Sequence, residues 1–259
     1  MYLGIDIGSS SSKAVILDAR GKILAGEVIN LGTGSKAGAE VVERALAAAG
    51  LRRDDVRYTV VTGYGRMKYA GADKQITEIT CHGKGVVSLY PKARTVIDIG
   101  GQDAKCIRLD ERGRVANFVM NDKCAAGTGR FLEVMARVLD CEIHALEELA
   151  ERAKTTISIS STCTVFAESE VISQLSQGAS REDVAYGAHK SIARRVVAMA
   201  ERIGIMDQVV MTGGVSLNRG ILRALREESG KRIYVPESPQ TIGALGAAIL
   251  ARQNGSGSF

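Results

Sequence analysis

The chain has 259 residues, 45% of them hydrophobic and 24% charged, and a formal net charge of +5, which is typical of a soluble globular protein of one or two domains. Tryptophan is absent, there are only four phenylalanines, and the basic residues form no stripe, so we expect no nucleic-acid partner. The apolar runs are too short to cross a membrane and the N-terminus does not resemble a signal peptide, which predicts a cytoplasmic protein without a membrane partner.

The predicted elements fall into two similar series along the chain. In the first series, strands lie near 2–7, 13–18, 22–29 and 58–62, with helices near 36–49 and 73–89. The second series has strands near 94–99, 104–109 and 114–121, followed by helices near 127–140, 144–153, 165–177 and 181–204. It continues with a strand at 208–212, a helix ending near 229, a strand at 232–235 and a closing helix at 242–252.

This order predicts an α/β protein of two similar halves. We expect the first half to span residues 1–93, with a C-terminal helix at residues 240–253 packing back on it. The second half would span residues 94–239 and carry the cysteines considered below. Residues 254–259, NGSGSF, are poor in apolar side chains and are expected to form a disordered tail.

A short sequence occurs once in each half. LGIDIGSSSSK, ending at Lys13, returns as VIDIGGQDAK, ending at Lys105. The matched pairs, each 92 residues apart, are Asp6 and Asp98, Gly8 and Gly100, and Lys13 and Lys105. Each copy reads as two strands joined by a glycine-rich turn, whose backbone N–H groups can approach an anion closely. Two such turns facing each other would clamp a polyphosphate from both sides.

Charge assigns roles within this clamp. Asp6 and Asp98, at strand ends beside a phosphate site, are expected to hold Mg²⁺ through its water shell, and Lys13 to meet a phosphate. Gln102 and Asp103 are candidates for orienting the attacking water, the alternative being that they only form the turn. The predicted phosphate contacts are Gly8, Ser9, Ser10, Ser11, Ser12, Lys13, Gly100, Gly101, Gln102 and Lys105.

A third feature is VVMTGGVSLNRG, residues 209–220. It reads as a strand, a Gly213-Gly214 turn and a helix, and the glycines leave room for a purine and ribose. With the two hairpins, this pattern resembles the actin, hexokinase and heat-shock-chaperone ATPases. The resemblance implies two ribonuclease-H-like domains with ATP or ADP and Mg²⁺ in the interdomain cleft. Further expected nucleotide contacts are Gly127, Gly129, Gly213, Gly214, Val215, Asn218 and Gln240.

Five cysteines in a chain without extracellular signals make disulfides improbable. Cys124 and Cys163 each precede a predicted helix, and a helix N-terminus stabilises a thiolate or a negative cofactor. Two thiolates do not complete a four-cysteine iron–sulfur cluster, whereas two copies of the chain on a two-fold axis supply four.

The alternative for any cysteine is plain burial as a small apolar side chain. That interpretation is adopted for Cys81, Cys106 and Cys141, which lie in apolar runs. Cys81 and His82 are adjacent, and adjacent side chains on a helix diverge by about 100°, so they are not expected to form a ligand pair.

Five longer strings carry a more specific resemblance. They are TGYGR (62–66), ADKQITEITCHG (72–83), VIDIGGQDAK (96–105), NDKCAAGTGRFLEVMA (121–136) and SSTCTVFAESEVISQLSQG (160–178). Together they resemble the 2-hydroxyacyl-CoA dehydratase activator family, which is related to benzoyl-CoA reductase ATPase subunits, and the likeness runs on to GALGAA (243–248). It implies an oxygen-sensitive homodimeric ATPase with one 4Fe–4S cluster shared between subunits and held by Cys124 and Cys163.

The same resemblance implies electron-transfer partners. Ferredoxin or flavodoxin would reduce the cluster, and ATP hydrolysis would drive the electron into a partner iron–sulfur enzyme. That partner would be a 2-hydroxyacyl-CoA dehydratase, a benzoyl-CoA reductase or a double-cubane cluster protein. Two rivals remain open: a sugar kinase with Asp122 as its general base, and a nucleotide-dependent assembly or chaperone module without redox chemistry.

Overall fold

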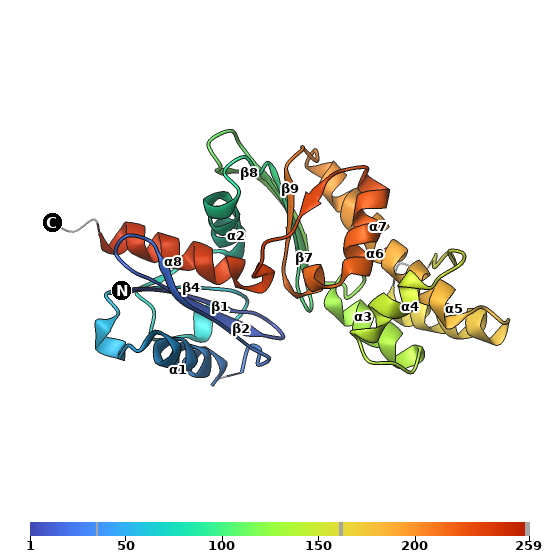
Figure 1. Ribbon diagram of the computed structural model, residues 1–259, viewed down its shortest axis with the longest axis horizontal. Coiled ribbons are helices and arrows are strands. Elements are labelled where there is room, and N and C mark those ends of the chain that lie inside the picture. The colour runs from blue at the N-terminus through green and yellow to red at the C-terminus, as the bar shows by residue number, and fades with distance from the viewer. Residues whose placement is uncertain (35, 161–162, 257–259) are drawn as a thin grey trace. The chain divides into compact units, whose positions relative to one another are not determined.

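The computed structural model describes residues 1–34, 36–160 and 163–256 (Figure 1). The chain divides into two compact units. Unit 1 comprises Met1–Val96, Leu109–Ala116 and Pro236–Phe259, and unit 2 comprises Ile97–Arg108 and Asn117–Val235. Among the described residues, no helix is both long enough and apolar enough to span a bilayer.

The sheet of unit 1 has the strand order β3-β2-β1-β4-β5. Strands β1, β2 and β3 are antiparallel neighbours, whereas β4 is parallel to β1 and β5 is parallel to β4. The bounds are β1 Tyr2–Ile7, β2 Ser12–Leu17, β3 Ile23–Ile29, β4 Tyr58–Thr62 and β5 Lys74–Gln75. All of β1 is buried, which explains its nearly continuous apolar sequence.

Helices cover this sheet. They are α1 (Ala37–Ala49), α2 (Glu78–Leu89) and α8 (Ile242–Gly255), with short 3-10 turns at Arg53–Asp55, Arg66–Lys68 and Pro239–Thr241. Helix α1 packs on β2 and β3, and α8 packs on β1, β4 and α2. Gly4 allows the close approach of α8 to β1, because a Cβ there would lie 2.1 Å from the Ala244 carbonyl oxygen.

The second sheet repeats the order of the first, as β10-β9-β6-β7-β8. Its strands are β6 Thr95–Ile99, β7 Ala104–Leu109, β8 Val115–Asn121, β9 Val209–Thr212 and β10 Ile233–Tyr234. The helices of unit 2 are α3 Gly129–Val138, α4 Ala145–Glu151, α5 Thr164–Ser176, α6 Arg181–Arg202 and α7 Arg219–Ser229, with a 3-10 turn at Gly214–Leu217. Buried side chains from the sheet and these helices form one core that includes Phe131, Met135 and Ile192. The predicted α/β fold of two similar halves is confirmed.

The duplication reaches further than the repeated motif. In the turn after β2, the Asp18 carboxylate accepts hydrogen bonds from the backbone N–H groups two and four residues on, both at 2.8 Å. In the turn after β7, Asp110 accepts the same two bonds at 2.9 and 2.8 Å. These backbone bonds lower the pKa of both carboxyl groups.

Two predicted helix boundaries differ most from the structure. The helix predicted at 73–89 begins at Glu78, because Lys74–Gln75 form edge strand β5 and Thr77 caps the helix by accepting from the Thr80 N–H. The closing helix runs to Gly255, and Asn254 donates its side-chain amide to the Leu250 carbonyl at 2.7 Å. Residues 254 and 255 of the predicted tail are therefore helical, and residues 257–259 lie outside the described residues.

Candidate functional site

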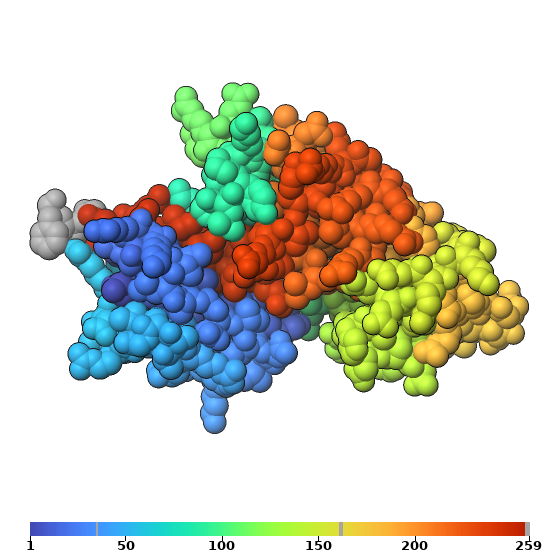
Figure 2. All heavy atoms as spheres, viewed as in Figure 1, coloured from blue at the N-terminus to red at the C-terminus, as the bar shows by residue number. Residues whose placement is uncertain are grey.

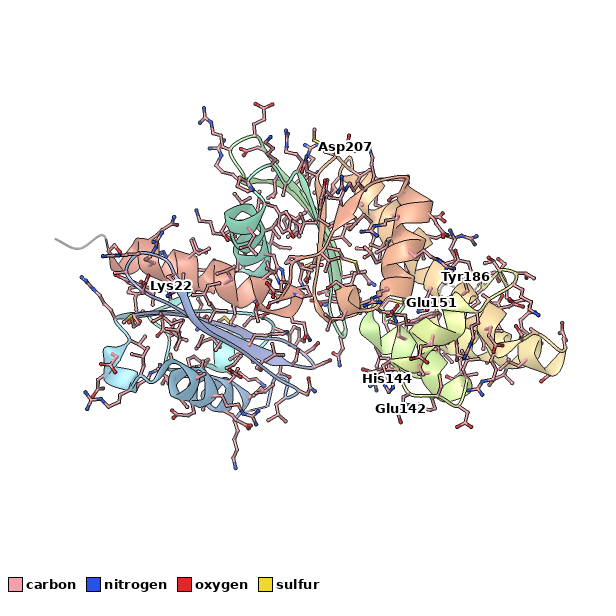
Figure 3. All side chains as sticks on the ribbon, viewed as in Figure 1. Lys22, Glu142, His144, Glu151, Tyr186 and Asp207 are labelled. Carbon is pink, nitrogen blue, oxygen red and sulfur yellow. The ribbon has the colours of Figure 1, made fainter. Side chains whose placement is uncertain are left out.

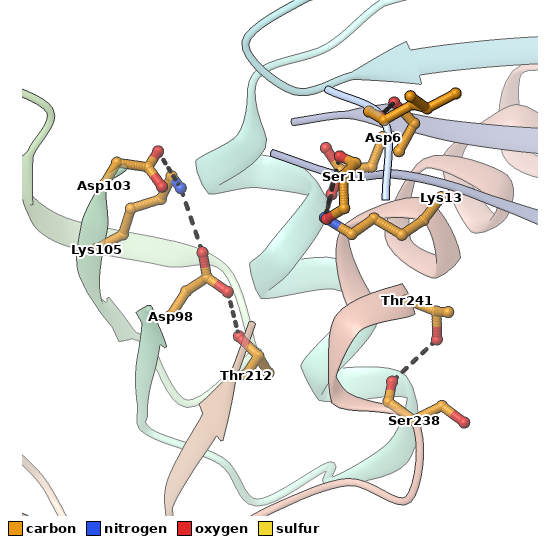
Figure 4. Close-up of polar contacts among 11 residues, drawn as sticks. Asp6, Ser11, Lys13, Asp98, Asp103, Lys105, Thr212, Ser238 and Thr241 are labelled. Atoms are coloured by element: carbon orange, nitrogen blue, oxygen red, sulfur yellow. Dashed lines mark hydrogen bonds and ion pairs between the residues drawn. The ribbon is translucent and has the colours of Figure 1, made fainter. Parts of the chain in front are cut away.

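The two repeated motifs form turns closed by the same kind of backbone hydrogen bond, and Figure 4 shows Lys105 paired with Asp98 and Asp103 in the second motif. In the first tip, residues 8–11, the Gly8 N–H donates to the Ser11 carbonyl at 3.0 Å. In the second tip, residues 100–103, the Gly100 N–H donates to the Asp103 carbonyl at 2.9 Å. The first tip joins antiparallel β1 and β2, and the second joins the neighbouring strands β6 and β7. The hairpin prediction is confirmed.

The strand after each tip carries a lysine that faces a carboxylate, but the two pairings differ. Lys105 Nζ lies 3.2 Å from Asp98 Oδ2 and 2.6 Å from Asp103 Oδ2, and its side chain is 3% exposed. Lys13 Nζ lies 3.8 Å from Asp6 Oδ2 and is 13% exposed. The second lysine is therefore held by two carboxylates at short range, whereas the first is held loosely by one.

A second strand end encloses each aspartate, and the sequence interpretation missed this. Strand β4 ends at Thr62, which lies opposite Asp6 in the parallel ladder. Gly63 follows with φ +91°, and a Cβ on it would lie 2.5 Å from Asp6 Oδ1. The signal was the same Thr-Gly pair after an apolar strand in each half, VVTG at 60–63 and VMTG at 210–213.

The corresponding strand end in unit 2 is β9. Thr212 Oγ1 donates to Asp98 Oδ1 at 2.8 Å, and Gly213, at φ +87°, would place a Cβ 3.0 Å from the same oxygen. Only glycine fits, because an added Cβ would also lie 2.3 Å from the Ile99 carbonyl oxygen.

The predicted adenosine turn continues from Gly213. Gly214 opens the 3-10 turn Gly214–Leu217, and Val215 is 7% exposed. Asn218 caps α7, accepting from the Ile221 N–H at 2.9 Å. Gln240, predicted as another nucleotide contact, lies in the Pro239–Thr241 turn of unit 1, half-buried.

The second tip is joined directly to the start of α3. The Gly129 N–H donates to the Gly100 carbonyl at 2.9 Å, and the Arg130 N–H donates to the Gly101 carbonyl at 2.8 Å. These are first-turn amides with no partner inside the helix. Gly127, at φ +86°, lies in the connection just before α3, and Gln102 at the tip itself is exposed.

Cys124 does not lie at a helix mouth, contrary to the sequence prediction. Helix α3 begins at Gly129 after the cap residue Thr128. Cys124 lies instead in a loop bound by the Asn121 side chain, which donates to the Cys124 and Ala126 carbonyls at 2.8 and 3.0 Å. The same side chain accepts from the Cys124 N–H at 3.2 Å.

Cys163 does lie at a helix mouth, as predicted. It is the N-cap residue of α5, and its carbonyl accepts from the Ala167 N–H at 2.9 Å. Both Cys124 and Cys163 are free and half-buried. Next to Cys163, the buried Thr164 hydroxyl has no hydrogen-bond partner among the described residues.

The other cysteines differ from these two. Cys81 and Cys106 are buried, and burial raises the pKa of each thiol to about 12, so the prediction of burial is confirmed for both. Cys141 is half-buried in a turn after α3, which corrects its assignment to an apolar run, and partial burial raises its thiol pKa. Asp122, the candidate base of a kinase, is exposed and lies 3.2 Å from Lys123 Nζ.

Two sheets of one strand order, each with an aspartate, a glycine tip and a lysine at the same place, define an ATPase of the actin and hexokinase fold. Residues 3–251 match the BadF/BadG/BcrA/BcrD ATPase family, and the chain belongs to that family. The predicted resemblance to dehydratase activators is confirmed by its relatives.

Three of these relatives illustrate the range. The activator of lactoyl-CoA dehydratase from Anaerotignum propionicum is 56% identical over 97% of each chain. The solved activator of the 2-hydroxyisocaproyl-CoA dehydratase from Clostridium difficile, with bound ADPNP, has a TM-score of 0.94 at 52% identity, covering 99% of this chain and 96% of that one. A benzoyl-CoA reductase subunit of Thauera aromatica is 36% identical, and the match covers 95% of this chain and 91% of that one.

Proposed function

We propose that this ATPase is an electron-transfer activator. It uses ATP hydrolysis to drive a low-potential electron through a 4Fe–4S cluster shared by a homodimer into a partner iron–sulfur enzyme such as a 2-hydroxyacyl-CoA dehydratase. The names of its relatives support the activator role. The observation that carries the proposal is the pair of hydrogen bonds between the second tip and the start of α3.

These bonds lead from the tip toward a cluster cysteine. The amides of Gly129 and Arg130 bind the carbonyls of the second tip, and Thr128 in turn donates its hydroxyl to the Ala125 carbonyl at 2.6 Å. Ala125 follows Cys124 in the loop that Asn121 binds. A displacement of the tip on nucleotide exchange would therefore move the Cys124 loop with it, provided that ATP and ADP favour different tip positions.

The residues around the two thiols suit an iron–sulfur cluster. Cys124 and Cys163 are free and half-buried, in two segments of unit 2 that lead into the mutually packed helices α3 and α5. The Thr164 hydroxyl, which has no partner among the described residues, is a donor placed beside Cys163. When bound, a cluster would supply one-electron transfer, and two thiolates from each of two chains would make its four ligands.

The surface next to Cys163 suits a second copy of the chain. Helix α5 carries Val165, Phe166 and Ile172, which are 66%, 69% and 51% exposed. Figure 2 shows α5 in gold at one end of unit 2. Large apolar side chains gathered beside a ligand position are typical of an interface, and a two-fold axis there would bring the four cysteines together.

The remaining roles complete the proposal. ATP binds together with Mg²⁺, with Asp6 and Asp98 on the hydrated ion and Lys13 on a phosphate. Gln102 or Asp103 orients the attacking water. Ferredoxin or flavodoxin donates the electron, and the acceptor is a dehydratase, a benzoyl-CoA reductase or a double-cubane cluster protein.

Anaerobic purification tests this proposal. The protein should be brown, with about four irons per dimer, and Cys124→Ser or Cys163→Ser should each abolish the colour while leaving ATP binding intact. Cys141→Ser is the matched control, because Cys141 is also half-buried, and it should keep the cluster.

Colourless wild-type protein after reconstitution with iron and sulfide would contradict the redox proposal and favour the assembly or chaperone module. A sugar kinase would instead release ADP together with a phosphorylated sugar, and Asp122→Asn would abolish that product.

A further inference from the structure

His189 is a buried histidine with an unusual environment. It lies in the middle of α6 and is 1% exposed. Neither ring nitrogen has a hydrogen-bond partner among the described residues. Burial, with a smaller contribution from Arg223, lowers the pKa of the imidazole to about 4. The ring is therefore neutral at pH 7, with one nitrogen that donates and one that accepts.

The ring packs against the first turn of α7, and α6 and α7 lie side by side (Figure 1). A Cβ at Gly220, the second residue of α7, would lie 2.8 Å from the His189 Cε1 atom and 2.9 Å from its Nδ1 atom. The same point is 3.1 Å from Asn218 Oδ1. The Nδ1 edge of the imidazole and the side chain of Asn218 thus share the space that glycine leaves open.

Packing alone does not account for a histidine here. A buried polar group without a hydrogen bond costs stability, whereas an apolar side chain of similar size carries no such penalty. His189 also lies near Asn218, which connects the predicted adenosine turn to α7. Asn218 ends the segment that begins at Gly213, and its Oδ1 atom caps the helix through the Ile221 N–H.

We propose that His189 is a positioning residue for the nucleotide site, which engages the side chain of Asn218 when the Gly213–Asn218 segment closes on adenosine. Asn218 can donate through its amide nitrogen while its oxygen keeps the helix cap. In this proposal the hydrogen bond between the imidazole and Asn218 forms when nucleotide is bound. This inference rests on the proposed function for the binding of ATP, and on the sequence prediction that adenosine contacts the Gly213-Gly214 turn.

An isosteric pair of variants separates polarity from packing. His189→Asn keeps a polar group near the position of Nδ1. His189→Leu has nearly the shape of asparagine but no polar group. Isothermal titration should show ADP bound about tenfold more weakly by the leucine variant, the worth of one good hydrogen bond, and within about threefold of wild type by the asparagine variant. Thermal unfolding without nucleotide should occur at no lower temperature in the leucine variant. Equal ADP affinity in the two variants would overturn the proposal.

A measurement on the wild-type chain keeps the test independent of variant folding. The chain has three histidines, so their imidazole ¹⁵N signals are separable by NMR. Adding ADP should shift the ¹⁵N signals of His189 and leave the signals of His144 unchanged. His144 is exposed at the start of α4 (Figure 3). ADP binding with unchanged His189 signals would refute the positioning role alone. Absence of ADP binding by the wild type would refute the adenosine placement as well.

Discussion

The two tips have the same backbone and different connections. Both close through a glycine N–H and the carbonyl three residues on, at 3.0 and 2.9 Å. The first tip is a run of serines, and Lys13 Nζ after it lies 3.8 Å from Asp6 Oδ2. In the second copy the buried Lys105 lies between Asp98 and Asp103. Two carbonyl groups of the second tip accept hydrogen bonds from the first amides of α3. The two copies therefore differ in how tightly the lysine is held, and the second tip is joined to the start of α3.

The largest expected difference between the tips is in stability. Asp98→Asn removes one of the two carboxylates that hold Lys105, which is only 3% exposed, and should lower the free energy of unfolding by about 3 kcal/mol. Asp6→Asn acts on a longer and more exposed pair and should cost about 1 kcal/mol. Urea unfolding of both variants checks the order. Equal losses would show that the two lysines are held alike.

The hydrogen bonds between the second tip and α3 can be removed one at a time. Gly129 is the first residue of α3, where proline is tolerated because that N–H has no partner inside the helix. Gly129→Pro should therefore remove the bond to Gly100 and keep the helix. In cluster-free protein, we expect ATP to change the alkylation rate of Cys124 by severalfold in the wild type and to have little effect in this variant, because only differential nucleotide affinity transmitted through the tip moves the loop.

Gly129→Ala is the matched control, since it adds a Cβ and retains the N–H. It should respond to ATP as the wild type does, with the rates read by mass spectrometry of the Cys124 peptide. An ATP response that survives in the proline variant would mean that the tip does not transmit through this bond.

The smallest expected effect is on the pH dependence of stability, and it concerns the turns at Asp18 and Asp110, which have the same hydrogen bonds in both halves. Backbone hydrogen bonds lower the pKa of Asp18 and Asp110 below the ordinary value of 3.8. The stability that each contributes is therefore present above pH about 3.8 and lost as the pH falls below it. Asp18→Asn and Asp110→Asn should each flatten the fall of Tm between about pH 5 and 3 by a similar small amount. A large difference between the two variants in how Tm changes with pH would show that these two turns have diverged as well.

The sequence predicted what depends on neighbouring residues. Asp6 to Lys13 and Asp98 to Lys105 are short segments whose alternation and glycines specify a hairpin locally, so both were identified. Cys163 at the mouth of α5 was identified for the same reason. The start of α3 was misplaced, because the small residues of Ala125–Gly129 suit a helix and a turn equally well, and the Asn121 side chain decides between them.

The sequence by itself determined that this protein has two glycine-tipped hairpins, a glycine turn and two cysteine blocks, together with the family that these strings resemble. Tertiary structure alone decided which distant groups lie beside these segments. Thr212 donates to Asp98, the α3 amides donate to the second tip, and His189 of α6 packs against Gly220 of α7. The physical reason is that a hairpin is specified by contacts within a few residues, whereas these pairings exist only once the sheets and helices have packed.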